Sequence, residues 1–454
     1  MNISQPLCRT YVYLFAALGM VFAVFCAWNL PPFMGPDEPA HFHRANLLLL
    51  GHLVGSRGGV SPEIYAGGMI DVAAADAMAP YMKFIGKPDP LSKADYAPAE
   101  NIGWDDRKLF AFYPNTAVYP PFFYLPQTIG IAIGKAAKLS IIQTLYVARS
   151  ANAVVCIAIG MWALALAGRA RVAMFTLLLL PMSIGVYSAM TQDGICLVTT
   201  ALGCAFISGA LSDARKMNLG ELIGAAICFA LVGMTKQPYA VFPLVLLAAP
   251  FDRSKLKYAI AAAAFLASAG WHLWMALAVQ TKLNPLFDPE GQMNYLLGHL
   301  SAIFPIAQQT LTTFIKQYSR EFIGVLGWLD TPLPSSFYSI AGVVVFLSFA
   351  FCASRGRYGL MSPLAILVML TSIALIFGGL YVSWTPVGAP MVQGVQGRYF
   401  LPVCMLLVLA LLREKPLVPA ENAVGRVASL AILAFPFLSL LVAERAIIVR
   451  YYLS

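Results

Sequence analysis

The sequence predicts an all-α polytopic membrane protein. Hydrophobic residues make up 59% of the 454 residues and charged residues only 11%, whereas a typical soluble domain has roughly 25% charged residues. Mostly apolar runs of about twenty residues, the length that crosses the bilayer core as a helix, recur along the chain. The net charge of +9 lies largely in short loops between these runs, which indicates membrane topology and no nucleic-acid partner.

About eleven segments are predicted to be transmembrane helices. They are residues 11–30, 146–168, 172–190, 194–211, 219–235, 239–251, 258–279, 337–353, 360–384, 399–412 and 427–443. Short loops rich in Lys and Arg mark the cytoplasmic side. Such residues are Arg9, Arg169, Arg171, Arg215, Lys216, Arg253, Lys255, Lys257, Arg355, Arg357, Arg413, Lys415 and Arg426. The chain is therefore predicted to be a multi-pass protein of a bacterial inner membrane, with its amino terminus inside and its carboxyl terminus outside.

Two long segments are then placed on the periplasmic side of a single integral membrane domain, residues 1–454. They are residues 31–149 and residues 280–337. The apolar stretch 118–135 is not counted as a span, because counting it would move every later basic loop to the outside. Its prolines and its aromatic cluster around Tyr119 instead predict an interfacial helix lying along the outer surface.

The cysteines indicate no special chemistry. The eight cysteines fall mostly within apolar runs and have no motif spacing. We therefore expect small core residues, with neither a disulfide framework nor a zinc site.

The densest polar cluster directly follows the first predicted span. The stretch Gly35–Ala45 reads GPDEPAHFHRA and holds Asp37, Glu38, His41 and Arg44. Ionisable groups are costly to hold beside the hydrocarbon, so such a cluster is a candidate functional site. The alternative is an ordinary polar loop at a helix end.

Other predicted helix ends bring polar groups to the same outer face. They are Arg149, Gln192, Asp193, Lys236, Gln396 and Arg398, with Trp328 and Asp330 in the second long segment. A carboxylate can take the proton of an attacking hydroxyl, while Arg and Lys side chains neutralise a phosphate. No Walker loop and no GxGxxG motif is present, so the pattern favours a group carried on a lipid phosphate over one carried on a nucleotide.

A metal site is an open alternative at the first cluster. Asp37, His41 and His43 are suitable ligand types for a divalent cation such as Mg²⁺ or Mn²⁺. However, residues two apart do not share a face of a helix. One histidine acting only as a hydrogen-bonding group remains the competing interpretation, and no cofactor is firmly indicated.

Several motifs resemble those of a family of bacterial polytopic membrane proteins that is similar to the GT-C superfamily of glycosyltransferases. They are Gly35–Ala45, Tyr-Pro-Pro from Tyr119, Arg149 near the start of an Ala-rich helix, Gly-Trp-Leu-Asp ending at Asp330, and Gln-Gly-Arg-Tyr ending at Tyr399. Members of the superfamily take sugars from polyprenyl-phosphate or polyprenyl-diphosphate carriers. An acidic residue in their long first outward loop acts as base or metal ligand.

The resemblance implies a membrane glycosyltransferase that moves one hexosyl or pentosyl group from an undecaprenyl-phosphate donor to a cell-envelope glycan or glycolipid. Asp37 or Glu38 matches the acidic position by its placement after the first span. Asp37 is expected to be the base, with Glu38 orienting it or aiding a metal. The expected phosphate-binding residues are Arg149, Lys236 and Arg398, and the expected sugar or acceptor contacts are His41, Arg44, Tyr119, Gln192, Asp193, Trp328, Asp330, Gln396 and Tyr399.

Two departures from the superfamily pattern limit that expectation. Gln192-Asp193 is not an Asp-x-Asp pair, which weakens a metal-dependent version, and no sizeable soluble domain follows the last span. Two other functions remain alternatives: a flippase for a lipid-linked glycan, and a ligase or polymerase that uses a diphosphate-linked donor. The short cytoplasmic loops argue against the flippase.

Overall fold

The protein is mostly helical, and seven of its helices are long and apolar enough to cross a membrane. The computed structural model describes residues 4–60, 63–87, 93–283, 286–355, 359–412, 415–416 and 423–453. The seven helices are α1 (Ser4–Asn29), α6 (Ile141–Leu166), α9 (Asp193–Ser212), α11 (Ser254–Ala278), α14 (Ser335–Cys352), α15 (Met361–Trp384) and α18 (Ala423–Ile448).

A bent pair of helices gives an eighth candidate span. The short 3-10 helix η2 (Gly168–Ala170) leads into α7 (Arg171–Leu178), and α8 (Pro181–Tyr187) follows at a bend of 77°. Pro181 lies at the break, where a residue without a backbone N–H readily begins a new helix. Within the described residues the count is therefore seven or eight, not the predicted eleven.

The three remaining predicted spans are helical but short or broken. Helix α10 (Leu219–Thr235) has 17 residues, about 25 Å at the usual rise, less than a bilayer core. The 3-10 helix η3 (Gln237–Ala248) contains Pro243. Residues 399–412 divide into η5 (Gly397–Tyr399), α16 (Phe400–Met405) and α17 (Leu407–Leu411). Apolar composition alone does not reveal these breaks.

Helix α9 forms the centre of the bundle. Buried residues make up 89% of its most apolar window, against 22% for α11 and 28% for α15. The outer helices expose large apolar side chains such as Leu277, Phe346 and Leu441, as expected of surfaces that face lipid. The seven cysteines whose side chains are described are all free.

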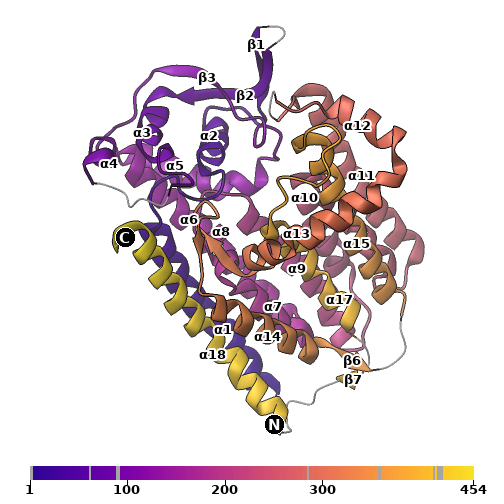
Figure 1. Ribbon diagram of the computed structural model, residues 1–454. Coiled ribbons are helices and arrows are strands. Elements are labelled where there is room, and N and C mark those ends of the chain that lie inside the picture. The colour runs from indigo at the N-terminus through magenta and orange to yellow at the C-terminus, as the bar shows by residue number, and fades with distance from the viewer. Residues whose placement is uncertain are drawn as a thin grey trace.

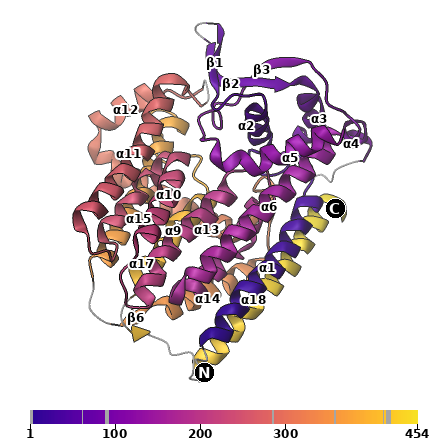
Figure 2. The ribbon, with the colours of Figure 1, turned by 180° about the vertical axis from the view of Figure 1, so that it is seen from behind.

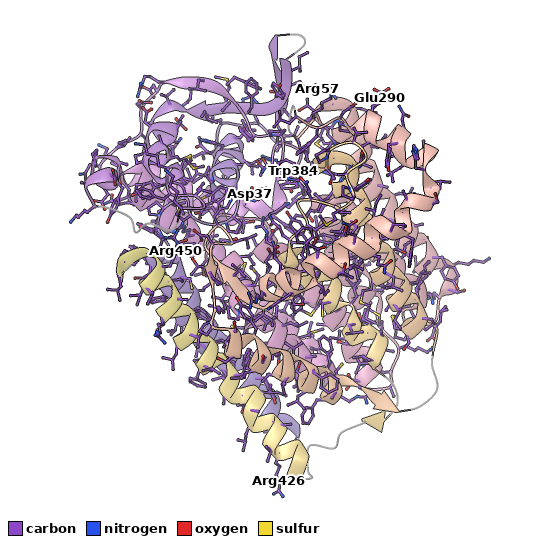
Figure 3. The ribbon with its side chains drawn as sticks, viewed as in Figure 1. Asp37, Arg57, Glu290, Trp384, Arg426 and Arg450 are labelled. Carbon is purple, nitrogen blue, oxygen red and sulfur yellow. The ribbon has the colours of Figure 1, made fainter. Side chains whose placement is uncertain are left out.

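The N-terminal end of the chain and Asp37 lie toward opposite ends of the molecule. Helices α1 and α18 run side by side in the same direction along one edge (Figures 1 and 2). The N-terminal end lies near the strands β6 (Ser354–Arg355) and β7 (Lys415–Pro416), and Arg426 is found there too (Figure 3). Asp37 lies toward the opposite end. The predicted basic residues Arg357 and Arg413 lie outside the described residues.

The first long segment folds into a lobe of helices and strands. Its helices are α2 (Glu38–Leu49), α3 (Val72–Met82), α4 (Lys93–Glu100), η1 (Phe122–Tyr124) and α5 (Leu125–Ala136). An antiparallel sheet of order β1 (Ser56–Val60), β2 (Glu63–Asp71), β3 (Lys108–Phe112) is also present. The expectation of an all-α protein is therefore wrong here. Glycines such as Gly67, where a Cβ would overlap the carbonyl of Ala111, weaken the alternating pattern that would have predicted a strand.

Helix α5 coincides with the predicted interfacial segment. Its 12 residues span about 18 Å, too little to cross a bilayer. Leu125, Ile129 and Ile133 form an exposed stripe at four-residue spacing, while the opposite side packs on α2 and α6. An interfacial position remains a prediction that this apolar stripe favours.

The second long segment is shorter and mostly helical. It contains α12 (Pro289–Gly298), η4 (Leu300–Ala302) and α13 (Ile303–Gly324), followed by the paired strands β4 (Val325–Leu326) and β5 (Thr331–Pro332). The chain ends with η6 (Val449–Leu453), a π-helix that continues α18.

Candidate functional site

Four charged side chains from distant segments form a continuous line of ion pairs, which we name the charge chain. Lys236 Nζ lies 2.8 Å from Asp193 Oδ1, and Asp193 Oδ2 lies 3.5 Å from Arg398 Nη1. Arg398 Nη2 in turn lies 2.9 Å from Asp37 Oδ2. All four residues were predicted from the sequence, and the structure brings them together. Two carboxylates thus alternate with two cations, so the charge chain has no net charge.

Each member of the charge chain lies at the end or break of a helix. Lys236 is the extended residue between α10 and η3, with φ −136° and ψ 133°. Asp193 is the first residue of α9, where a negative charge favours the helix dipole. Arg398 lies in η5. Asp37 precedes α2 in a left-handed conformation, with φ 56°, which Asp tolerates better than most residues.

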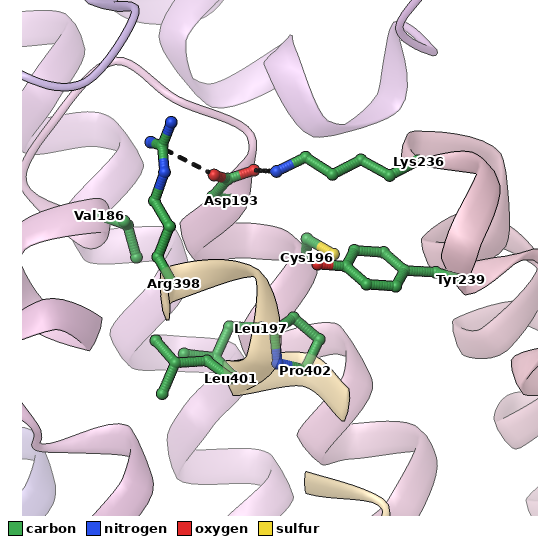
Figure 4. A pocket seen from close by; sticks show the side chains of 9 residues that line it. All are labelled: Val186, Asp193, Cys196, Leu197, Lys236, Tyr239, Arg398, Leu401 and Pro402. Atoms are coloured by element: carbon green, nitrogen blue, oxygen red, sulfur yellow. Dashed lines mark ion pairs between the residues drawn. The ribbon is translucent and has the colours of Figure 1, made fainter. Parts of the chain in front are cut away.

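A small pocket lies beside the charge chain. Figure 4 shows Lys236, Asp193 and Arg398 along one side, and the apolar side chains on the other. Its lining residues are Val186, Asp193, Cys196, Leu197, Lys236, Tyr239, Arg398, Leu401 and Pro402. The pocket has a volume of about 10 Å³, room for roughly one water molecule. A polar edge on an apolar wall suits the junction of a charged head group and a hydrocarbon.

A buried neutral histidine borders the charge chain. His41 Nδ1 is 2.6 Å from the Tyr124 hydroxyl, and Nε2 is 3.3 Å from Thr191 Oγ1. Burial lowers the pKa of His41 to about 4, although the nearby Asp37 opposes this effect. The ring of Tyr119 stacks on His41 at 6.2 Å. Because His41 is neutral at neutral pH, it adds no charge to the charge chain.

Glu38 and Arg149 form a separate buried pair. Arg149 Nε and Nη2 donate to the two oxygens of Glu38 at 2.8 and 2.6 Å. The other three N–H groups donate to the carbonyls of Ala27, Leu30 and Pro31, which lie at the end of α1 where helical carbonyls lack partners. A guanidinium has five N–H donors, so Arg149 has none left for a phosphate.

The environment of Glu38 supports a structural role. Its carboxylate also accepts from the backbone N–H groups of Gly35 and Met190. Burial alone would raise the pKa of Glu38, but the charge and hydrogen bonds of Arg149 outweigh burial and lower it. The expected phosphate contact of Arg149 and the expected orienting contact between Glu38 and Asp37 are therefore replaced by a clamp that joins α1, α2 and α6.

The remaining predicted residues divide between the charge chain and other places. Gln396 Oε1 accepts from Arg398 Nε at 2.7 Å, and the ring of Tyr399 lies 4.3 Å from Lys236 Nζ. Gln192 is fully buried, and neither of its amide atoms has a hydrogen-bond partner within the described residues.

Arg44 and Asp330 lie outside the charge chain. Arg44 donates to the carbonyls of Tyr119 and Leu53 and so fixes the backbone beside Tyr119. Asp330 pairs with Arg450 at 3.1 Å and accepts from the Tyr451 hydroxyl, which ties the second segment to the end of the chain. Trp328 lies in the same turn, half-buried. In the described residues these side chains make contacts within the protein, and the expected contacts with sugar stay predictions.

The geometry gives little support for a divalent cation. Among the described residues, no group of three or more His, Cys, Asp and Glu side chains is arranged to hold a metal ion. Asp193 is engaged by Lys236 and Arg398, and Asp37 by Arg398. Lys236 and Arg398 therefore already neutralise the two carboxylates that a metal ion would need as ligands.

Three residues at the site were missed by sequence reasoning. Tyr239 donates from its hydroxyl to the carbonyl of Tyr399 at 2.8 Å. Thr191 accepts from the N–H of Asp193 and contacts His41. Glu321 of α13 accepts from the backbone N–H of Gly397 at 2.7 Å. None of the three belongs to a motif that could have indicated it.

A family model described as a predicted membrane protein, DUF2142, matches residues 18–407. The chain belongs to this family. The match includes all four residues of the charge chain and the Glu38–Arg149 pair, and it ends before α18. No curated protein and no solved structure matches the chain. Membership of the DUF2142 family agrees with the expectation of a polytopic membrane protein.

Proposed function

We propose that the protein is a membrane glycosyltransferase that moves one sugar from a polyprenyl-phosphate carrier to a glycan or glycolipid. The observation that carries this proposal is the charge chain. A partly exposed carboxylate, Asp37, lies in line with two cations, Arg398 and Lys236, beside a pocket with an apolar wall. The resemblance of the sequence motifs to the GT-C superfamily supports the same reaction.

Asp37 is the base in this mechanism. Its side chain is 38% exposed, more than that of any other member of the charge chain, so an acceptor hydroxyl can reach it. The carboxylate takes the hydroxyl proton as the hydroxyl oxygen attacks the anomeric carbon of the donor sugar. A new glycosidic bond forms, the bond between that carbon and the phosphate oxygen breaks, and polyprenyl phosphate leaves with the bonding electrons.

Lys236 and Arg398 hold the phosphate. The leaving phosphate gains negative charge as the bond breaks, and fixed cations in a site with little water stabilise that charge strongly. Arg398 Nη1 is buried and makes no hydrogen bond among the described residues, so it can donate to a phosphate oxygen. The pocket, at about 10 Å³, must widen to admit the phosphate, and its apolar side, with Leu401 and Pro402, would then face the first carbons of the lipid chain.

The sidedness of the reaction is part of the proposal. The charge chain lies toward the end of the molecule that holds the first lobe, whereas the N-terminal end, β6, β7 and Arg426 lie at the other. If the basic end faces the cytoplasm, as the charge rule predicts, the reaction takes place on the periplasmic side of the inner membrane.

The test is turnover of defined donors by the purified full-length protein. We expect release of undecaprenyl phosphate from at least one hexosyl or pentosyl undecaprenyl phosphate when a glycan or glycolipid acceptor is present. Asp37→Asn should abolish turnover, since Asn cannot take a proton yet keeps the left-handed backbone. Asp76→Asn is the matched control, because Asp76 is exposed and its ion pair in the described part of the chain is with Arg107.

The outcomes separate the alternatives. Full activity of Asp37→Asn would remove the assignment of the base. Turnover of diphosphate-linked donors alone would make the protein a ligase or polymerase. Movement of a fluorescent lipid-linked glycan across a vesicle bilayer without turnover would make it a flippase.

A further inference from the structure

Helix α13 carries a buried carboxylate that the proposed reaction does not use. The side chain of Glu321 is almost fully buried, and its oxygens accept from two uncharged groups, the Gly397 backbone N–H and Gln317 Nε2, both at 2.7 Å. A buried carboxylate costs free energy unless its hydrogen bonds are well made. The hydrogen bond between Glu321 and Gly397 indicates the role of this buried carboxylate, because Gly397 directly precedes Arg398.

Gly397 packs directly on the backbone of α13. A Cβ at this position would overlap the carbonyl oxygen of Tyr318 and the backbone nitrogen of Phe322. Only glycine allows this approach. The last turns of α13 therefore determine where the backbone of η5 lies, and the Glu321 hydrogen bond fixes it there.

The backbone around Arg398 is held from both sides. Glu321 binds the N–H of Gly397 before it, and the Tyr239 hydroxyl binds the carbonyl of Tyr399 after it. The guanidinium contacts Gln396 and the carboxylates of the charge chain, and its Cζ lies 5.5 Å from the centre of the Tyr399 ring. Among the described residues its Nη1 makes no hydrogen bond and has only the long ion pair of 3.5 Å with Asp193. The direction in which Nη1 points thus depends on the backbone anchors.

We propose that Glu321 is a positioning residue that orients Arg398 toward the anionic phosphate of the lipid carrier. This inference rests on the proposed function, because it requires a phosphate ligand at Arg398. Glu321 acts through the backbone of Gly397 and does not contact the ligand. The length of the Glu321 side chain, which lets it reach the Gly397 N–H, matters for this role, whereas its negative charge does not.

Two substitutions separate reach from charge. Glu321→Asp keeps the charge but is shorter by one methylene group, so it cannot reach the Gly397 N–H. Glu321→Gln keeps the reach and removes the charge, and Gln317 can turn its amide to suit. Gln317→Ala is the matched control on the same helix, since it removes the other hydrogen bond of Glu321 and leaves Gly397 untouched.

The measurement is binding of undecaprenyl phosphate and of undecaprenol to the full-length protein in detergent, by native mass spectrometry. We expect Glu321→Asp to weaken undecaprenyl phosphate about tenfold, the scale of one lost hydrogen bond to a charged ligand. Glu321→Gln and Gln317→Ala should remain within about threefold of wild type. Undecaprenol should bind all four proteins equally, which a general loss of structure would not produce.

Three results would overturn the inference in distinguishable ways. If wild type and Glu321→Asp bind undecaprenyl phosphate equally well, Glu321 does not position Arg398, and the proposed function stands. If Glu321→Gln is weakened as much as Glu321→Asp, the negative charge is needed as well as the reach, and the inference that Glu321 acts by its reach alone fails. If wild type prefers undecaprenol or shows no preference for the phosphate, the proposed function fails, and the inference fails with it.

Discussion

Arg398 Nη2 lies 2.9 Å from Asp37 Oδ2, although the two residues are 361 positions apart in the chain. The same guanidinium lies 3.5 Å from Asp193 through Nη1. Arg398 therefore joins the turn after α1 to the start of α9, which is the centre of the bundle. It also pairs with Oδ2 of the carboxylate that we propose as the base, so a phosphate that draws Arg398 toward itself would free that oxygen for the proton of the acceptor.

Arg398→Lys should lower kcat/KM for the lipid-phosphate donor roughly a hundredfold. A lysine is a single point charge and cannot pair with two carboxylates and a phosphate through separate N–H groups. The measurement is donor turnover by the purified variant. Arg107→Lys, at an exposed ion pair with Asp105, is the control and should retain wild-type turnover. Full activity of Arg398→Lys would show that the fork geometry of Arg398 is not needed.

Glu38→Gln should destabilise the protein by about 3–5 kcal/mol. Removing one partner leaves the buried Arg149 with an uncompensated charge, and the clamp loses the bidentate contact between α2 and α6. Thermal unfolding in detergent measures this loss. Activity per folded molecule should change little. Unchanged stability together with lost turnover would instead support the catalytic role of Glu38 that was expected from the sequence.

Stability should fall as the pH is lowered from about 6.5 toward 4. Burial lowers the pKa of both His41 and His43 to about 4, against about 6.5 in an unfolded chain. Between these values only the unfolded chain binds the protons, so acid favours unfolding by up to about 3 kcal/mol for each histidine. Above pH 6.5 neither state is protonated, and this contribution disappears.

The check on these histidines is thermal unfolding between pH 8 and pH 5. The double variant His41→Gln/His43→Gln should show a smaller loss of stability over this interval than wild type. His299→Gln, at an exposed position, should leave the loss unchanged. An equal slope in wild type and the double variant would contradict the prediction.

Turnover should be insensitive to EDTA. Lys236 and Arg398 already pair with the two carboxylates that a divalent cation would require, and they supply positive charge for the phosphate. The measurement is donor turnover before and after chelation, and after addition of Mg²⁺ or Mn²⁺. Loss of activity with EDTA that Mg²⁺ restores would show that a metal replaces one of these ion pairs during the reaction.

Asp330→Asn should weaken the attachment of the chain's end without affecting turnover. Asp330 pairs with Arg450 and accepts from Tyr451, and hydrogen bonds to a charged group contribute roughly 2 kcal/mol. Faster proteolysis near the end of α18 would report the change. A large rise in KM for donor or acceptor would instead support the sugar contact expected from the sequence.

The sequence predicted which residues lie at the site better than it predicted the partners of their side chains. Asp37, Asp193, Lys236 and Arg398 all stand at the ends of apolar stretches, so topology alone predicts that they approach one another. The role of Arg149 could not be predicted in the same way, because its partners are the carbonyls of Ala27, Leu30 and Pro31. Every residue has a backbone carbonyl, so the sequence does not show which carbonyls accept hydrogen bonds from Arg149.

The number of spans was overestimated for a related reason. The apolar residues of 219–235, 239–251 and 399–412 predict helices correctly, but hydropathy does not distinguish lipid-facing from protein-enclosed surfaces. Helices η3 and α16 can be short because neighbouring elements cover their ends. Lys236 and Arg398 lie at two such helix breaks. The breaks that make these segments shorter than predicted spans therefore also place two residues of the charge chain.

The parallel course of α1 and α18 has a practical consequence for experiments in living cells. Because both helices run in the same direction along one edge (Figure 1), the beginning of α1 and the end of α18 are separated by the full length of the bundle. If both helices cross the bilayer, a fluorescent protein fused ahead of α1 and an alkaline phosphatase fused after α18 would occupy different compartments. One doubly tagged chain would then report its own orientation in a single culture.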